Sequence, residues 1–493
     1  MDVLSSVLSN LFSPICLVFM CFGCLMGIIF GALPGLSGTV GVTLLLPMTI
    51  GMKSELGIAL LISIWIGGVS GGFISATLLG IPGTASSIAT CFDAYPLCRQ
   101  GKARKALETG IIASFIGTFF SCIIAMILCQ YVAKVAMRLG PWEYFSLCTC
   151  AIILVVSLSQ GNMAKGMAGA GLGLLLACVG AAPVDAVARF TFGNYNLYGG
   201  INSTGMMLGI FAIFLVLNNF AKNEMSLTDK ESGGTGGEGL SLQEFKDNIG
   251  NMFRSFMYGL WIGFLPGMGA GHSNLVAYGQ AKSASKHPEQ FGKGCVDGVF
   301  ATECSNNASV GGALIPMVSL GIPGDATTAV LLGALTIHGL EPGPLLFANN
   351  PVYVYVLFGA AIISAVLVLG MQLGGKRFFP SILKIPYHYL YPAILMLCFI
   401  GAYTASNTIF AIGVMLAMTA VALFLEWADI PKTPFILANI LGSMLEKYLR
   451  RGLSYSTNGW LSFVTRPVSL IFLLIAVGSL LWPMISKKRK EAK

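Results

Sequence analysis

The sequence predicts an all-α membrane protein that crosses the bilayer about ten to twelve times, in two inverted-topology repeats with broken helices or re-entrant hairpins. Its residues are 55% hydrophobic and only 10% charged, and the mean hydropathy is +0.79. This composition is typical of a polytopic membrane protein and excludes a water-soluble one. Long apolar windows recur along the chain, and one glycine- and proline-rich phrase occurs twice, as LGIPGTASS and LGIPGDATT.

Several apolar windows are themselves, or are the centres of, segments long enough to cross a hydrocarbon core of about 30 Å. The clearest are Leu11–Phe30, Ile111–Cys129, Phe145–Leu158, Gly205–Leu217, Val352–Leu373, Ile409–Leu425 and Ser469–Trp482. No cleavable leader pattern precedes the first of them, so we expect an uncleaved helix there.

A polar segment divides the chain into two halves. Residues 222–247 are rich in charges and glycines that cannot bury themselves. The division predicts a first transmembrane repeat at 1–221, a linker at 222–247 and a second repeat at 248–493. Ser241 and Glu244 form a capping-box pattern before apolar residues spaced three and four apart. This pattern predicts an interfacial helix that leads into the next span.

The two halves repeat the same motifs in the same order, which is the signature of an internal duplication. The matching pairs are Gly27–Gly35 with Gly259–Gly267 (both GxxxGxLPG), Gly71-Gly72 with Gly311-Gly312, and Leu79–Gly83 with Leu320–Gly324 (both LGIPG).

Basic residues lie on opposite sides of the LGIPG phrase in the two halves. Between its motifs the first half has only Lys53, and after LGIPG the second half has no Lys or Arg until Lys376. The basic residues gather instead at Arg99, Lys102, Arg104 and Lys105 in the first half and at Lys282, Lys286 and Lys293 in the second. Equivalent loops are therefore expected to face opposite sides of the membrane, as in inverted repeats. A parallel duplication is the alternative.

The paired phrases predict a substrate site near the middle of the membrane. Gly and Pro interrupt helices, and the freed backbone groups survive only inside protein or a hydrated cavity. Helix N-termini and nearby hydroxyls suit a carboxylate, although a lone proline is more often a simple kink. The expected substrate-binding residues are Pro34, Gly35, Ser37, Gly83, Thr84, Ser86, Ser87, Pro266, Gly267, Gly324, Thr327 and Thr328.

Four further residues are candidates for ion coupling, with Na⁺ or H⁺ as the coupling ion. Ionisable groups inside a membrane are costly and are functional candidates by default. The four are Glu303, Asn306, Asn307 and Asp325. A role as a helix cap or at the interface is the alternative. Asp93 and Asp297 are expected near a surface.

Enzymatic classes find little support in the sequence. HExxH and P-loop motifs are absent, and the four histidines lack metal-ligand spacing. We therefore expect no cofactor and no metal beyond a possible Na⁺ site. His272 either lines the site or, as we expect, is a hydrogen-bonded histidine at the membrane boundary. The scattered basic residues do not favour nucleic acid, and a channel is less consistent with paired broken helices than a carrier.

Long signatures in the chain resemble the large membrane subunit of the tripartite tricarboxylate transporter family. They include GALPG at Gly31, the run from Gly263 through ATECSNNASVGG, and IHGLEPGPLLF ending at Phe347. The resemblance implies a bacterial inner-membrane carrier for citrate or other carboxylates, driven by an ion gradient. It also implies two partners, a small membrane subunit and a periplasmic solute-binding protein. The motif positions of the family correspond here to Pro34, Gly35, Pro82, Gly83, Glu303, Asn306, Asn307, Pro323 and Gly324.

The expected mechanism is alternating access. We favour an elevator in which motif-bearing helices slide against scaffold helices such as Ile111–Cys129 and Ile409–Leu425, with rocking as the alternative. The basic tail that begins at Lys487 places the C-terminus in the cytoplasm. Alternative functions are a stand-alone ion-coupled organic-anion carrier and an integral membrane enzyme.

Overall fold

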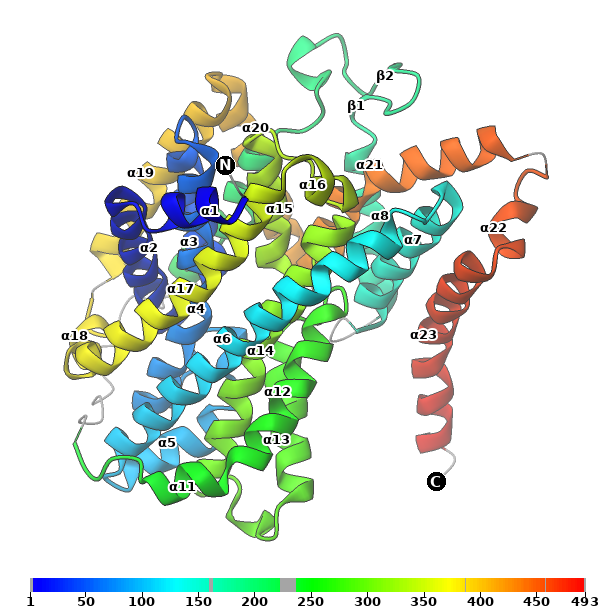
Figure 1. Ribbon diagram of the computed structural model, residues 1–493. Coiled ribbons are helices and arrows are strands. Elements are labelled where there is room, and N and C mark those ends of the chain that lie inside the picture. Colours follow the sequence, from blue (N-terminus) through cyan, green and yellow to red (C-terminus); the bar gives the residue numbers. More distant parts are fainter. Residues whose placement is uncertain (1–2, 159–162, 222–235, 386, 457, 492–493) are drawn as a thin grey trace.

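A computed structural model describes residues 3–158, 163–221, 236–385, 387–456 and 458–491. The described chain is almost entirely helical, with one antiparallel pair of two-residue strands, β1 (Gly180–Ala181) and β2 (Ala188–Arg189), in which Gly180 lies opposite Arg189. Most helices run alongside one another, as Figure 1 shows. The predicted all-α fold is confirmed.

The helices of the first half are α1 (Val3–Leu11), α2 (Pro14–Ala32), α3 (Gly38–Leu45), α4 (Ser54–Leu78), α5 (Cys91–Arg99), α6 (Ala103–Ala136), α7 (Pro141–Leu158), α8 (Met163–Ala177), α9 (Ser203–Met207) and α10 (Phe214–Ala221). Those of the second half are α11 (Leu242–Asp247), α12 (Ile249–Phe264), α13 (Gly269–Ala284), α14 (Val296–Leu320), α15 (Ala326–Ile337), α16 (Pro344–Asn349), α17 (Pro351–Gly375), α18 (Phe379–Ile382), α19 (Tyr387–Ser406), α20 (Ile409–Trp427), α21 (Lys432–Tyr455), α22 (Leu461–Thr465) and α23 (Pro467–Glu491).

The described chain contains seven helical segments that are long and apolar enough to cross a membrane, by length and composition. They are Pro14–Ala32, Ser54–Leu78, Ala103–Ala136, Ser203–Ala221, Pro351–Ile382, His388–Ser406 and Ile409–Trp427. Shorter apolar helices, and α14, which is buried but polar, fall outside this set. The predicted crossings, about ten to twelve, are more numerous because they included such helices. The chain is a multi-pass membrane protein.

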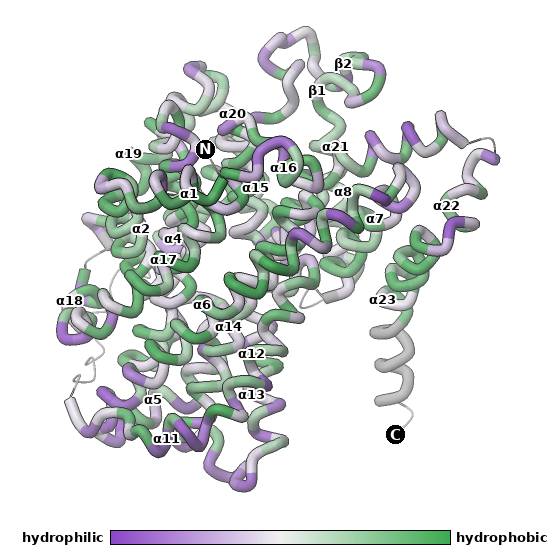
Figure 2. The backbone as a smooth tube through the Cα atoms, in the orientation of Figure 1, coloured by the Kyte–Doolittle hydropathy of each residue, from purple (hydrophilic) through white to green (hydrophobic). Residues whose placement is uncertain are grey.

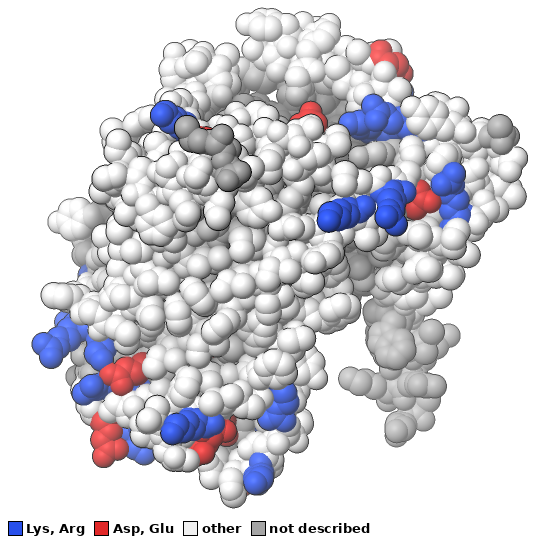
Figure 3. All heavy atoms as spheres, viewed as in Figure 1, with Lys and Arg blue, Asp and Glu red and all other residues white. Residues whose placement is uncertain are grey.

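Polar residues lie toward two ends of the molecule. Figure 2 shows hydrophilic segments in the loops beyond α5, α11 and α13 and around β1 and β2, with hydrophobic helices between them. On the face shown in Figure 3, the Lys, Arg, Asp and Glu side chains form groups separated by a band almost free of charge. Such a band is what a hydrocarbon layer requires, because a charged side chain within it is costly.

The basic loops of the two halves meet at one end. Asp93 on α5 accepts hydrogen bonds from the backbone N–H groups of Gly292, Gly294 and Cys295, at 2.9, 2.9 and 2.8 Å. Asp93 is completely buried by this loop, so the side chain that we expected near a surface is not exposed there. At the opposite end of the molecule, after the last residue of α15, the ring of His338 lies 3.0 Å from the Thr49 hydroxyl.

The linker packs against the membrane helices where it is described. Residues 222–235, and residues 492–493 of the basic tail, lie outside the described residues. The predicted capping box is confirmed, because the Ser241 and Glu244 side chains each accept from the other's backbone N–H. Glu244 also pairs with Lys105 of α6 at 2.7 Å, and Leu240 donates to Glu108. The last residues of the linker are therefore held to the first turns of α6 by charged groups, while none of the residues of α11 is buried.

Equivalent glycines pack two helix pairs closely. A methyl group at Gly31 of α2 would overlap the carbonyl oxygen of Gly68 on α4. A methyl group at Gly263 of α12 would overlap the carbonyl oxygen of Ser309 on α14 in the same way. Small residues let membrane helices approach until their backbones touch.

The structural register corrects one sequence match by one residue. Gly71 packs against Ile28, and the residue that makes the corresponding contact, with Leu260, is Gly312. The counterpart of Gly71-Gly72 is therefore Gly312-Ala313, whereas the sequence comparison paired the two glycine doublets directly. With the halves matched in this way, the residue of the first half that is equivalent to Glu303 is Ile62, and the residue equivalent to Asn307 is Ile66.

One long helix of each half packs against a motif-bearing helix of the other half. On α17, Ser364 lies 2.8 Å from Ser63 of α4, hydroxyl to hydroxyl. On α6, Ser114 donates to Glu303 of α14 at 3.2 Å. The window Ile111–Cys129 of α6, which we expected in a separate scaffold, thus makes a buried polar contact with a motif-bearing helix.

Candidate functional site

Two tight turns end α2 and α12 at the predicted LPG motifs. Gly35 and Gly267 have φ angles of +83° and +79°, a region that L-amino acids with side chains rarely adopt. Each turn sends the chain back along a second helix, α3 or α13, so each half contains a helical hairpin with its tip at LPG.

The hairpin tips and the segments that follow the LGIPG phrases surround one cavity of about 330 Å³. Its size is at the lower end of the range for small-molecule sites. Residues from both halves line it, including Ser37, Thr39, Trp65, Thr84, Ser86, Gly267, His272, Asp325, Thr327 and Thr433. We call this cavity the central pocket. Within the described chain, the residues that line it include no Lys or Arg.

Several helix N-termini point at the central pocket. Ser37 caps α3 and accepts from the N–H of Val40 at 3.3 Å. Asp325 caps α15 and accepts from the N–H of Thr328 at 2.8 Å. The N–H groups of the first two residues of each helix have no carbonyl acceptor within the helix. Together with the start of α13 at Gly269, these ends direct the positive poles of three helix dipoles toward the pocket.

Hydroxyl groups from the two halves meet in the pocket. The Thr39 and Thr327 oxygens are 2.6 Å apart, and those of Thr84 and Ser86 are 2.7 Å apart. Thr39 escaped the sequence prediction, although it follows the LPG motif closely in LPGLSGT.

The predicted substrate residues fall into two groups. Those that line the central pocket are Ser37, Thr84, Ser86, Gly267 and Thr327. Those that lie outside its lining are Pro34, Gly35, Gly83, Ser87, Pro266, Gly324 and Thr328. Most of the second group form the turns themselves, and Ser87 and Thr328 complete capping boxes with Thr84 and Asp325.

Asp325 has two roles in the structure. It caps α15, which is the alternative the sequence left open, and it also lines the central pocket. Thr84 holds the corresponding position in the first half, with Ser87 as its capping partner. At this position the second half therefore has a carboxyl group where the first half has a hydroxyl.

Glu303 lies in a separate polar cluster behind the pocket. Its side chain is completely buried and accepts from Thr90 at 2.5 Å, Ser114 at 3.2 Å and Asn306 at 3.3 Å. Asn307 donates to Glu303 at 3.4 Å and accepts from Thr118 at 3.1 Å. Among the described residues, no Lys, Arg or His lies within ion-pair distance of Glu303. An unpaired charge in such a place is strongly unfavourable.

One contact chain joins this cluster to the pocket. Asn274 of α13 accepts from the N–H of Ala89 at 2.7 Å and donates to Thr90 at 3.2 Å. Thr90 follows closely after the pocket-lining Ser86 and is bound to Glu303. The four predicted ion-coupling residues therefore do not form one cluster: Asp325 is at the pocket, and the other three are behind it. The spacing of Ser114 and Thr118, one turn apart in an apolar helix, is the sequence signal for their role.

His272 lines the central pocket. Its Nδ1 lies 2.5 Å from the Met268 carbonyl oxygen, whereas its buried Nε2 has no hydrogen-bond partner within the described chain. The expectation of a fully hydrogen-bonded boundary histidine is therefore wrong, since Nε2 has no partner among the described residues.

Comparison with known proteins agrees with these features. A family model described as the tripartite tricarboxylate transporter TctA family matches residues 17–437. An uncharacterized 52.8 kDa protein in the TAR-I ttuC' 3' region of Agrobacterium vitis is 30% identical over 499 aligned positions, which cover 100% of this chain and 99% of that protein. An uncharacterized protein in the TAR-II ttuC' 3' region of the same organism is 31% identical over 236 positions, covering 47% of this chain and 98% of that protein. No solved structure matches the chain.

Proposed function

The chain belongs to the TctA family of tripartite tricarboxylate transporters, and we propose that it carries citrate or another small organic carboxylate across the bacterial inner membrane by cation symport. The observation that carries this proposal is the convergence of helix N-termini and hydroxyls from both halves on the central pocket. Such donors stabilise carboxylate oxygens without a basic side chain.

The central pocket is the proposed substrate site. Backbone N–H groups at the starts of α3 and α15 supply donors, and Thr39, Thr84 and Thr327 supply hydroxyls. His272 Nε2 is free to accept from a hydroxyl or a protonated carboxyl of the substrate, or to donate when the ring is protonated. These groups suit a small molecule with several carboxyl and hydroxyl oxygens.

A coupling cation, most simply Na⁺, would bind beside Asp325. An ionised Asp325 would repel a carboxylate in the same cavity, and a cation between the two would replace this repulsion by two attractions. Backbone carbonyls freed at the broken helices are suitable additional ligands. Binding of the anion would then require the cation, which is the basis of symport.

The Glu303 cluster is the second proposed coupling element. Its carboxyl group receives only hydrogen-bond donors from the described residues, so the charge must be cancelled by a proton or by a cation. Because Thr90 links Glu303 to the pocket-lining segment, a change of charge at Glu303 would move one wall of the pocket. H⁺ is the alternative to Na⁺ as the ion at this position.

We propose that the two halves are inverted repeats that support alternating access. The equivalent contacts of Gly31 and Gly263 and the meeting of both basic loops at one end support this. The end with the basic loops would face the cytoplasm by the positive-inside rule, and the C-terminus is proposed to lie on that side.

An elevator is the proposed motion. The helices α2 to α6 and α12 to α17 would move together, because α6 and α17 are each hydrogen-bonded to a motif-bearing helix of the opposite half. The helices α7 to α10 and α19 to α23 would form the scaffold. Proposed partners are a small membrane subunit and a periplasmic solute-binding protein, which deliver the substrate to the carrier.

Uptake into proteoliposomes tests the proposal. Vesicles that contain the chain and both partners are given labelled citrate and a panel of dicarboxylates, with and without an inward sodium gradient. We expect gradient-driven accumulation of one of these acids. Accumulation that is independent of both sodium and proton gradients would reject symport, and the absence of uptake for every acid would reject carboxylate transport. Omission of each partner in turn distinguishes a tripartite carrier from a stand-alone one.

A further inference from the structure

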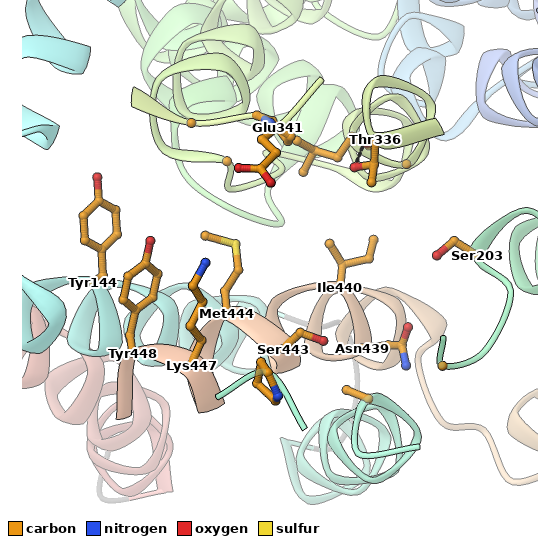
Figure 4. Close-up of a pocket in the computed structure, with 18 of the residues that line it drawn as sticks. Tyr144, Ser203, Thr336, Glu341, Asn439, Ile440, Ser443, Met444, Lys447 and Tyr448 are labelled. Atoms are coloured by element: carbon orange, nitrogen blue, oxygen red, sulfur yellow. Dashed lines mark hydrogen bonds between the residues drawn. The ribbon is translucent and has the colours of Figure 1, made fainter. Parts of the chain in front are cut away.

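A second and larger cavity, of about 1190 Å³, lies next to the central pocket. Figure 4 shows Thr336 and Glu341, from the end of α15 and the loop after it, on one side and residues of α21 on the other, with Tyr144 of α7 beside them. The first turn of α15 lines the central pocket and its last turn lines this cavity. The two spaces therefore follow one another along α15.

One face of α21 also connects the two spaces. Asn439, Ser443, Lys447 and Arg451 all line the larger cavity, and their spacing of four residues places them on one face of the helix. Thr433, at the start of the same helix, lines the central pocket. With a rise of 1.5 Å per residue, the face from Arg451 to Thr433 is about 27 Å long.

The two basic residues of this face lack partners in the described chain. Neither Lys447 nor Arg451 forms an ion pair there, whereas the adjacent Arg450 pairs with Asp185 at 2.7 Å and with Glu446 at 2.8 Å. The carboxylate of Glu341 faces the cavity from the opposite side (Figure 4), without an ion pair to either cation. The lining thus has two positive groups and one negative group, an excess of one positive charge. A concave wall strengthens the electric field of such an excess inside the cavity.

Apolar side chains separate the cavity from the central pocket. Met207, Leu332 and Ile440 line the inner part of the larger cavity, and Ile436 is buried one turn nearer the pocket. Charged substrate would not pass this layer while the helices keep their present positions.

We propose that the larger cavity is a second carboxylate-binding site, an outer vestibule in which Lys447 and Arg451 hold the anion before it reaches the central pocket. The vestibule rests on the proposed function, since it assigns a waiting position to the same substrate. It lies toward the end where His338 meets Thr49, away from the basic loops. Substrate would enter there from the periplasmic side.

Thiol labelling tests the vestibule without relying on transport. Ser443→Cys, in the complex with both partners, is treated with thiosulfonate reagents of equal size that carry either a negative or a positive charge. The quantity measured is the ratio of the anionic to the cationic reaction rate. We expect this ratio to be roughly tenfold higher at Ser443→Cys than for a free thiol in solution. The double change Lys447→Gln/Arg451→Gln should abolish this preference. Arg450→Gln, which removes a paired charge from the neighbouring position, is the matched control and should leave the preference intact.

Uptake measurements on the same variants separate the two proposals. With Lys447→Gln/Arg451→Gln we expect a KM raised roughly tenfold at low salt, with an unchanged maximal rate and less dependence on ionic strength. Wild-type uptake together with no charge preference at Ser443→Cys would overturn the vestibule and leave the proposed function standing. A charge preference without uptake by the wild type would instead reject the proposed function, and with it the role of the vestibule in transport.

Discussion

The side-chain hydroxyls of Thr39 and Thr327 lie 2.6 Å apart in the central pocket, although 288 positions separate them in the sequence. Thr39 belongs to the first turn of α3 and Thr327 to the first turn of α15. Their contact joins the two halves of the chain at the point where both present helix N-termini.

The hydroxyls of this pair are predicted to contribute to substrate affinity. Thr39→Val and Thr327→Val keep the shape but remove one hydrogen-bonding group, worth about 1 kcal/mol, so each should raise the KM for uptake about fivefold. Thr149→Val is the matched control, because among the described residues that hydroxyl bonds to the Phe145 carbonyl of its own helix alone. Unchanged KM values in both pocket variants would remove these hydroxyls from the substrate site.

Asp325 can be tested separately as a helix cap and as a charge. Asp325→Thr copies the capping residue found at Thr84 and removes only the carboxylate, while Asp325→Ala removes both. Threonine retains most of a cap that is worth about 1 kcal/mol, so we expect Asp325→Thr to fold normally and to lose the dependence of substrate binding on sodium. Binding and thermal unfolding are measured with and without sodium. If Asp325→Thr keeps the sodium dependence of the wild type, Asp325 is a cap alone.

Replacement of Glu303 by glutamine is expected to uncouple transport from the ion. Glutamine keeps the size of the side chain and one acceptor oxygen, which can accept from Thr90 or from Ser114, but it carries neither a charge nor a titratable proton. Exchange of labelled for unlabelled substrate should persist while gradient-driven accumulation is lost. Ser114→Ala, which removes one donor only, should retain accumulation. Full accumulation by a folded Glu303→Gln protein would show that the ion binds elsewhere.

A disulfide between α4 and α17 tests the proposed motion. Ser63 and Ser364 are in contact, hydroxyl to hydroxyl, at 2.8 Å and are buried away from the pocket. In an elevator both helices move as one body, so Ser63→Cys/Ser364→Cys, with Cys24 replaced by Ala, should transport equally well when oxidised and when reduced. Rocking of one half against the other would be blocked by the oxidised form. A loss of transport that reduction restores would therefore argue for rocking.

The sequence predicts the framework better than the polar clusters. Gly and Pro act locally, so the breaks at LPG and the capping box at Ser241 follow from short motifs and occur where predicted. The partners of Glu303 could not be predicted, because Thr90 and Ser114 come from the other half and reach it only through the packing of α5 and α6 on α14. The choice between the two roles of His272 could not be made from the sequence for a related reason: whether Nε2 has a partner depends on what surrounds the ring in space.

The most direct test of the account is a structure of the complex determined with sodium and with the carboxylate that the uptake panel identifies. We predict density for the acid in the central pocket, with its oxygens at the first turns of α3 and α15 and in contact with Thr39 or Thr327, and a cation beside Asp325. Density for the acid beside Glu303 would contradict the proposed site. So would structures of the transport cycle in which the acid occupies the larger cavity and never the central pocket.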